Sequence, residues 1–495
     1  MKRANIFFLF AAVALACLSL PAKAQTLNSA YFTEDFKYRH MLNPAFGNEQ
    51  NYIAVPALGN MSMQLRGNIG LKDLLFQDPT TGKYSRTFMH PDVSTGAALS
   101  GINDVNRLQT NIDLTLLSAG FHAFGGYNTI EVNEKTMVGV MLPYELFEFA
   151  KNIGNKSYTF DNFGARAMSY AEVALGHSRQ LSSSLRMGAK LKVLIGAGRA
   201  DVNISGMKAN LVGNEWRITT SGAVADVNVK GIQFKNTTDD YKQASRGSYE
   251  HIDLGETDVD GAGTSGFGLG LDLGAEYNFQ NSSAEALRTL RLSAALTDLG
   301  FISWSEGVQL VQKKQEFVFH GFHEVPVKKE DAQGNPMPNQ MEDQTDSYAD
   351  QLSDFIALQE GGHGGRTTSL AATLNVAAQY ALPVYQPLSF GVLMQHRFFG
   401  DYSWTEGRLS ANWAPLKWLD GGVSVAVGSF ATSMGWVLNV HPAGVNFFVG
   451  MDHILGSVSK EGIPLNSNAS ICIGMNVAWG KAPKKKAYSK YRRLL

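Results

Sequence analysis

Residues 266–280 read GFGLGLDLGAEYNFQ, and their side chains alternate strictly between two kinds. Every odd position from Phe267 to Phe279 is apolar, whereas the even positions hold glycine, aspartate, glutamate, asparagine or glutamine. Successive side chains of a β-strand point to opposite faces of the sheet. The stretch therefore predicts a strand with one wholly apolar face and one small or polar face.

The same alternation recurs along most of the chain, for example in residues 185–195 and 469–479. A soluble sandwich would also alternate, so the pattern alone does not place the sheet in a membrane. Several of the runs, however, last about ten residues or more, which is the length needed to cross a bilayer at a tilt. No segment after the first twenty residues is long and apolar enough to span a membrane as a helix.

Aromatic residues gather near the ends of the alternating runs, as expected at two lipid–water interfaces. We expect Trp304, Tyr402 and Trp404 to mark one rim of a barrel, and Tyr380, Tyr385, Trp413, Trp418 and Trp479 to mark the other. The connections alternate between short ones, such as 180–185, 380–388 and 440–445, and long ones, such as 68–111, 143–167, 200–266 and 301–367. Outer-membrane barrels show this asymmetry, with short periplasmic turns and long external loops.

These observations predict an all-β fold, a transmembrane antiparallel β-barrel of about fourteen strands. If residues 216–225 and 226–234 form two more strands, the number rises to sixteen. A closed sheet leaves no unpaired backbone edge in the hydrocarbon layer. Charged residues on the polar face would then line the lumen; the candidates are Arg186, Lys190, Lys192, Asp272 and Glu276.

The N-terminus has the layout of a secretory signal, with Lys2 and Arg3, an apolar run from Ile6 to Leu20, and Ala22-Lys23-Ala24 before a cleavage site. An alternative is a lipidated Cys17. We therefore divide the chain into a signal peptide (1–24), an N-terminal periplasmic or lumenal segment (25–59), an outer-membrane barrel (60–480) and a basic periplasmic tail (481–495).

The stretch from Tyr31 to Gly59 is apolar and rich in turn signals, but it does not alternate cleanly. The interior of a barrel of this size is wide enough to need filling. One hypothesis is that this stretch enters the lumen as a plug, with Phe36, Tyr38, Leu42, Asn43, Pro44 and Phe46 as the candidate residues. The alternative is a periplasmic lead-in packed on the first strand.

The sequence shows no motif that predicts a catalytic group, a metal site or a cofactor site. His320, His323 and Glu324 lie close together but lack a third strong ligand. The net charge of −1 argues against a nucleic-acid partner. The long connection from Ser305 to Arg366 contains apolar residues at helical spacing, namely Tyr348, Leu352, Phe355 and Ile356. This spacing predicts a short amphipathic helix. The helix would be either packed on the loops or used as a lid or docking surface.

Several motifs carry a family resemblance: Leu42-Asn43-Pro44-Ala45-Phe46, Tyr52-Ile53-Ala54-Val55-Pro56, Thr87-Phe88-Met89-His90-Pro91, Leu142-Pro143-Tyr144 and Leu296-Thr297-Asp298-Leu299-Gly300. With them the chain resembles a Bacteroidota family of outer-membrane barrels of unknown function. More distantly it is similar to FadL-type transporters of apolar compounds and to the shuttle barrel of the type IX secretion system. One departure is the basic tail after Trp479, since many outer-membrane barrels end on an aromatic residue.

Two functions are compatible with this sequence. In the first, the barrel is a FadL-like transporter or channel for apolar or amphipathic small molecules. In the second, it is a scaffold whose loops dock an exported protein or a secretion component. A continuous apolar path through the lumen would favour transport, and a lumen filled by its own residues would favour docking.

Overall fold

The computed structural model describes residues 27–56, 58–151, 156–204, 206–213, 215–220, 223–260, 263–312, 314–321, 340–442, 444–454 and 467–480. The expected signal peptide and the expected basic tail lie outside these residues. His323 and Glu324, which were considered together with His320 and rejected as a metal site, also lie outside them.

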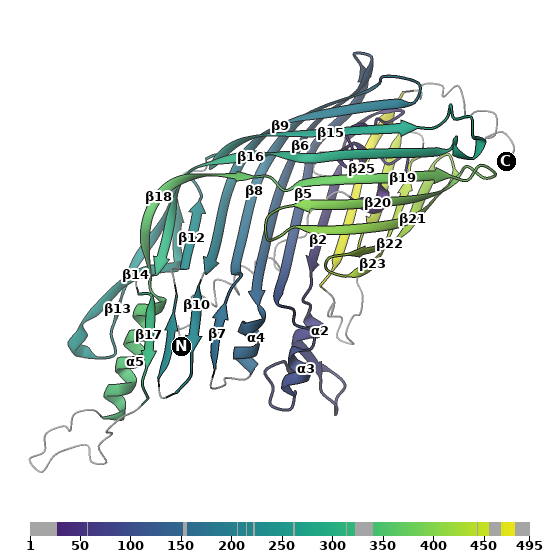
Figure 1. The fold of residues 1–495 in the computed structure, drawn as a ribbon. Helices are drawn as coiled ribbons and strands as arrows, with labels where there is room; N and C mark the ends of the chain where they lie inside the picture. Colours follow the sequence, from purple (N-terminus) through teal and green to yellow (C-terminus); the bar gives the residue numbers. More distant parts are fainter. Residues whose placement is uncertain are drawn as a thin grey trace, which may run out of the picture.

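The main feature is an antiparallel sheet that closes on itself (Figure 1). Among the described residues, the sheet has seventeen strands; β18 (Leu358–Ser369) pairs with β16 (Leu290–Gln312) alone, and the other sixteen form the ring. They are β1 (Asn51–Ala54), β2 (Asn60–Gly67), β5 (Val105–Ala123), β6 (Gly126–Pro143), β8 (Phe163–Gln180), β9 (Leu185–Ile204), β12 (Ala223–Asn228), β15 (Gly266–Asn278), β16 (Leu290–Gln312), β19 (Ala372–Ala381), β20 (Leu388–Phe398), β21 (Trp404–Leu416), β22 (Leu419–Gly428), β23 (Thr432–Val440), β24 (Val445–Met451) and β25 (Ala469–Trp479).

The ring closes where the last strand meets the first two. β25 pairs with β1, with Trp479 opposite Asn51, and with β2, with Ala469 opposite Leu65. β1 and β2 thus share one place between β5 and β25, and β12 and β15 share one place between β9 and β16. A path around the ring therefore crosses fourteen strand positions. The predicted antiparallel barrel is confirmed.

The two extra strands considered for residues 216–234 do not form a further hairpin of the ring. β11 (Trp216–Thr219) lies in a separate four-stranded sheet, and β13 (Ile232–Asp240) pairs with β14 (Ser248–Val259) outside the ring. Only β12 joins the ring, between the last residues of β9 and of β16.

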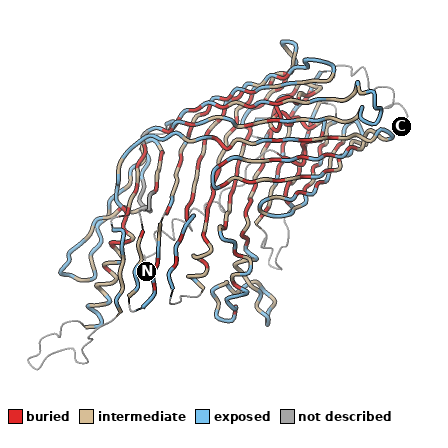
Figure 2. The backbone as a smooth tube through the Cα atoms, in the orientation of Figure 1, coloured by how far each residue is buried: buried red, intermediate tan, exposed pale blue. Residues whose placement is uncertain are grey.

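The alternation in the sequence separates the two faces of the ring. In β15, Leu269 and Leu273 are 52% and 46% exposed on the outside, whereas Asp272 between them is 1% exposed on the inside. Buried and exposed positions alternate in this way along many of the strands (Figure 2). An apolar outer face is what a lipid bilayer requires, because lipid tails offer no partner for charged groups.

The two ends of the ring differ, and we call them the loop end and the turn end. At the turn end, strands are joined by tight connections such as residues 181–184 and 417–418. The loop end carries the remaining elements (Figure 1): α2 (Leu71–Leu74), β3 (Leu75–Gln77), β4 (Tyr84–Thr87), α3 (Thr95–Leu99), α4 (Tyr144–Lys151), β7 (Ser157–Phe160), β10 (Met207–Asn210), β17 (Glu316–Phe319), α5 (Met341–Ile356) and β18 (Leu358–Ser369). α5 confirms the predicted amphipathic helix, and no described helix is long and apolar enough to cross a membrane.

The expected aromatic rim at the loop end is wrong. Trp304, Tyr402 and Trp404 are 2–4% exposed and point into the lumen. Trp404 has the same parity as the buried Glu406 and Arg408 on its strand, and parity decides which face a side chain occupies. At the turn end, Trp413, Trp418 and Trp479 are about half exposed on the outside, as expected.

Candidate functional site

The N-terminal segment, residues 27–50, lies inside the ring. It has no regular structure beyond two single turns, η1 (Asn28–Ala30) and η2 (Arg39–Met41). Its contacts reach strands all around the wall. The Ser29 N–H donates to Asp452, which follows β24, and Tyr31 Oη lies 3.0 Å from Ser293 Oγ on β16. On the other side, His40 Nε2 lies 2.7 Å from Glu131 Oε1 on β6, and Ser178 Oγ on β8 donates to the Ala45 carbonyl at 3.1 Å. Since these strands surround the lumen, the segment fills it at this level.

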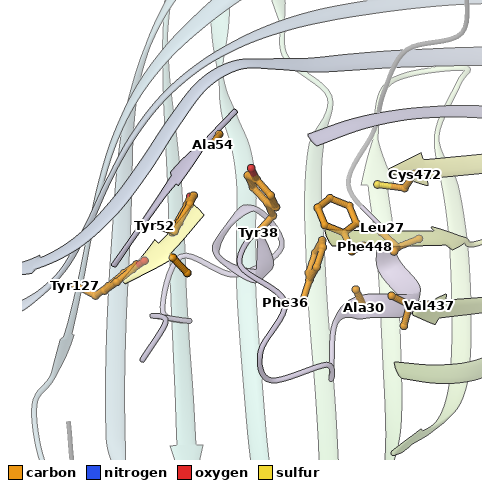
Figure 3. Packing of buried hydrophobic residues seen from close by; sticks show 11 residues of the cluster. Leu27, Ala30, Phe36, Tyr38, Tyr52, Ala54, Tyr127, Val437, Phe448 and Cys472 are labelled. Atoms are coloured by element: carbon orange, nitrogen blue, oxygen red, sulfur yellow. The ribbon is translucent and has the colours of Figure 1, made fainter. Parts of the chain in front are cut away.

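All six candidate plug residues are buried in this segment. The ring of Phe36 meets Phe448 of β24 edge to face at 4.7 Å, and Tyr38 packs beside it (Figure 3). Leu42 and Phe46 pack with Tyr31 and with two residues of the wall, Ala377 and Leu393. Asn43 Oδ1 accepts the Ala45 N–H at 2.9 Å and holds the turn around Pro44.

Glycines on the inner face of the wall make room for the segment. A Cβ atom at Gly274 would lie 2.0 Å from Asn43 Oδ1, and one at Gly188 would lie 2.1 Å from the Pro44 carbonyl oxygen. Any larger residue at these positions would therefore collide with the segment. Gly274, in the alternating stretch 266–280, and Gly188 on β9 thus leave space for the segment inside the lumen.

The five candidate charges of the lumen lie at two levels. Nearest the turn end, Arg186 Nε donates to Ser178 Oγ at 2.9 Å, and Glu276 stands opposite Arg186 in the register of β9 and β15. Further from this end, Lys190 forms an ion pair with Glu131, the carboxylate that also contacts His40.

Lys192 and Asp272 belong to a buried ion-pair network, which we call the charged layer. Lys192 Nζ lies 2.8 Å from Asp272, 2.6 Å from Asp298 and 3.5 Å from Glu172. Lys135 bridges Asp298 at 3.1 Å and Glu172 at 3.3 Å. Glu131, Lys135, Glu172 and Asp298 were not among the lumen-facing charges predicted from the sequence.

A cavity of about 70 Å³ lies between the N-terminal segment and the charged layer. Its walls include Asp272, Lys192 and Met41. Asn133 Oδ1, Gln395 Oε1 and Trp404 Nε1 belong to buried side chains that line it, and these atoms have no hydrogen-bond partner within the described residues. Buried polar atoms of this kind are favourable only where water or a polar ligand reaches them.

An apolar layer closes the lumen toward the loop end. It consists of Met137, Met141, Met168, Tyr170, Leu194, Ile302, Trp304, Leu370, Ala371, Phe399 and Tyr402. Phe399 and Tyr402 belong to the hairpin between β20 and β21, whose Gly400 has φ +54°. A Cβ atom at Gly139 on β6 would lie 2.4 Å from the Tyr402 ring, so the hairpin reaches the strand on the far side of the ring.

His320, one of the three residues considered and rejected as a metal site, lies 3.2 Å from Glu215 at the loop end. The described residues bring together a different set, Asp35, Asp420 and His441, at the turn end. These three residues are far apart in the sequence, and no local spacing could have indicated them.

Residues 44–452 match the model of a family of unknown function, DUF5723. The chain belongs to this family. No curated protein matches the chain significantly.

Several solved structures are similar to this DUF5723 protein. They include the Ralstonia pickettii toluene transporter TbuX (10% identity, 90% of this chain and 94% of that chain covered, TM-score 0.39) and the Pseudomonas putida toluene transporter TodX (9%, 92% and 93%, 0.37). A Pseudomonas aeruginosa FadL homologue is also similar (6%, 93% and 98%, 0.38).

Proposed function

We propose that this protein is a gated transporter of the outer membrane for apolar or amphipathic small molecules. The order of layers in the lumen supports this proposal. If the loop end faces outward, as in other outer-membrane barrels, an entering molecule meets the apolar layer first and the charged layer second. This order suits an amphipathic molecule that has an apolar body and a polar group.

The N-terminal segment is the proposed gate. Many of its contacts with the wall are hydrogen bonds, such as those to Asp452, Ser178 and Asn375, the last donating to the Leu42 carbonyl at 2.8 Å. Water can replace such bonds when the segment leaves, so each contributes only about 0.5–1.5 kcal/mol of net stability, or about 1.5–3 kcal/mol where the partner is charged, as Asp452 is. A segment held in this way can move without unfolding the wall.

A disulfide that locks the segment to the wall tests the proposal. Ser29 Oγ and Ser424 Oγ of β22 lie 3.2 Å apart, and both side chains are buried. The double variant Ser29→Cys/Ser424→Cys, with Cys472→Ser to remove the native thiol, would be placed in proteoliposomes. The probe is dansyl-undecanoic acid, an amphipathic fluorescent molecule. We expect uptake when the disulfide is reduced and at least a tenfold slower uptake when it is oxidised.

The matched controls are the two single-cysteine variants in the same Cys472→Ser background, whose uptake should not respond to oxidation. Uptake that is no faster than in protein-free vesicles in every redox state would contradict transport of this class of molecule. Equal uptake in the reduced and oxidised double variant would contradict the gate.

The second candidate function is docking of an exported protein or a secretion component. The observation that favours it is the size of the structure at the loop end, where the sheet of β7, β10, β11 and β17, the β13–β14 hairpin and α5 extend well beyond the ring (Figure 1). Native mass spectrometry of the full-length protein, gently extracted from its own membrane, distinguishes the two functions. A small apolar adduct supports transport, whereas a co-purifying polypeptide without a small ligand supports docking.

A further inference from the structure

Three side chains with metal-binding atoms converge where the N-terminal segment meets the wall at the turn end. Asp35 belongs to the segment, Asp420 to β22, and His441 follows β23. One ligand atom of each lies within 4.8 Å of the others. His441 Nε2 is 3.4 Å from Asp420 Oδ1 and 3.8 Å from Asp35 Oδ2.

The histidine provides a second, independent indication of a ligand. The His441 side chain is 10% exposed, and its Nε2 is buried without a hydrogen-bond partner among the described residues. This atom points toward the two carboxylates. The backbone N–H of His441 donates to the Trp418 carbonyl at 2.7 Å, which fixes the residue beside β22.

Asp420 is held in position by a chain of three asparagines from neighbouring strands. Asn476 donates to Asn446 Oδ1 at 3.3 Å, Asn446 donates to Asn439 Oδ1 at 3.0 Å, and Asn439 donates to Asp420 Oδ1 at 2.6 Å. All three amides donate in the direction of the carboxylate, so the chain orients the Asp420 side chain. Such outer hydrogen bonds orient the carboxylates of metal sites.

The carboxylates have no lysine or arginine in direct contact. Within the described part of the chain, no such residue forms an ion pair with Asp35 or Asp420 at 4 Å or less. Lys37 is a nearby positive charge, but its Nζ donates to Gln50 Oε1 at 3.3 Å. The two carboxylates lie close together, since one oxygen of Asp35 and one of Asp420 are within 4.8 Å of each other. The Asp35 backbone N–H also donates to Asp420 Oδ2 at 3.4 Å. A cation between them would relieve the repulsion of two like charges.

We infer that Asp35, Asp420 and His441 form a site for a divalent first-row metal ion such as Zn²⁺, which ties the N-terminal segment to the wall. Imidazole with carboxylate oxygens suits such ions better than Ca²⁺ or Mg²⁺. Two ligands at about 2.0 Å from a tetrahedral ion lie about 3.3 Å apart. His441 Nε2 and Asp420 Oδ1 are already at 3.4 Å, and Asp35 Oδ2, at 3.8 Å from His441 Nε2, would move slightly inward on binding. Asp35 is 35% exposed, so an ion and its remaining water ligand reach the site from the turn end.

The role of this site in gating rests on the proposed function. Binding of the ion does not depend on that function. With the ion bound, release of the segment requires the loss of Asp35 from the metal. With the ion removed, the segment keeps only its hydrogen bonds and packing. The metal therefore favours the closed lumen.

Full-length protein in detergent, stripped with a chelator, would be titrated with Zn²⁺ by calorimetry and with Co²⁺ by visible absorption. We expect one ion per chain, and Co²⁺ bands typical of a mixed nitrogen and oxygen site. Asp35→Asn and His441→Ala should each weaken Zn²⁺ binding at least tenfold. The control is His90→Ala, which removes an exposed histidine 3.9 Å from Asp92 that has no third ligand, and it should leave binding unchanged.

Hydrogen exchange supplies the structural measurement. Zn²⁺ should slow the exchange of the amides of residues 31–38 at least fivefold in the native protein and leave it unchanged in Asp35→Asn. The inference is overturned if native protein, Asp35→Asn and His441→Ala bind Zn²⁺ equally, or if none binds it. Absence of dansyl-undecanoic acid uptake would contradict the proposed transport and leave the Zn²⁺ titration unaffected, so the two failures are distinguishable.

Discussion

Lys192 is the centre of the charged layer, because it contacts three carboxylates while its own side chain is 3% exposed. Lys192→Met would leave Asp272 and its neighbours without this cation. Breaking a buried ion pair from one side costs about 3–5 kcal/mol, because a charge stays buried without its partner. We expect a loss of this size in the free energy of unfolding, measured by guanidinium titration in phospholipid vesicles.

Two further variants separate this effect from a general effect of losing a lysine. Lys192→Met/Asp272→Asn removes both charges and should recover part of the lost stability, since coupled residues are not additive. Lys208→Met, at an exposed position of β10, should change stability by less than about 0.5 kcal/mol. A Lys192→Met protein as stable as the native one would contradict the charged layer.

At the scale of residues, strand parity indicates which face of the sheet a side chain occupies, but not which residue it pairs with. Lys190, Lys192 and Asp272 are buried at the parity that the alternation assigns to the inner face. Their partner Asp298 was missed because it lies at an irregularity of β16, where its φ of +56° interrupts the register. The predicted position of Trp404 on an outer rim was wrong because an aromatic residue near a strand end is typical both of a membrane rim and of a filled lumen.

The N-terminal segment is the element with the clearest test by substitution. Gly274→Leu puts a side chain where Asn43 and Pro44 lie, and the collision should push the segment out of the lumen. We expect single-channel conductance in planar bilayers to rise at least threefold. Gly407→Leu on β21, where a Cβ atom meets nothing closer than 3.9 Å, is the control and should not change the conductance.

Helix α5 docks on the loop before β14 through two buried aspartates. Asp350 accepts the Lys242 N–H at 2.6 Å, and Asp354 contacts Arg246 and Lys314 at 2.9 Å and the Tyr241 hydroxyl. Burial alone would raise the pKa of Asp354, but these hydrogen bonds outweigh burial and lower it below 3.8. Burial and the bond to Asp354 raise the pKa of Tyr241 to about 12, so its hydroxyl remains a donor at neutral pH.

The lowered pKa of Asp354 makes the docking of α5 dependent on pH. A carboxyl whose pKa is lower in the docked state stabilises docking above its ordinary pKa and loses this contribution as the pH falls through the lowered value. We expect slow amide exchange in residues 341–356 at pH 7, and faster exchange, after correction for intrinsic rates, only below about pH 4. Asp354→Asn should exchange fast already at pH 7, while Glu342→Gln, at an exposed position of the same helix, should behave as the native protein. Exchange in Asp354→Asn as slow as in the native protein would show that the carboxylate does not hold the helix.

At the scale of elements, the long alternating strands and α5 were predictable because periodicity is a local property of the sequence. The sequence left two locations open for the N-terminal segment, the lumen and the periplasm. The segment has no periodicity, and its path is fixed by contacts with distant strands. The inward hairpin at Phe399 and Tyr402 was missed for the same reason. Its apolar residues are buried only because the opposite wall lies across the lumen from them.

For the whole molecule, the outer apolar face is the property that distinguishes a membrane barrel from a soluble one. Leu191 lies near the middle of this face, where it is 66% exposed and stands opposite Leu175 of β8 and Leu271 of β15. Leu191→Arg would place a charge against lipid, which costs about 2–4 kcal/mol at the bilayer midplane and about 0–1 kcal/mol near the interfaces. We expect this loss in the free energy of unfolding in vesicles and a much smaller loss in detergent micelles, where water reaches the side chain.

The matched control is Leu287→Arg, in the turn-end connection at η4 (Glu285–Leu287), which should cost less than about 1 kcal/mol in both vesicles and micelles. Equal effects of the two substitutions in vesicles would mean that the face around Leu191 does not contact lipid, and the barrel would then have to be covered by something other than a membrane.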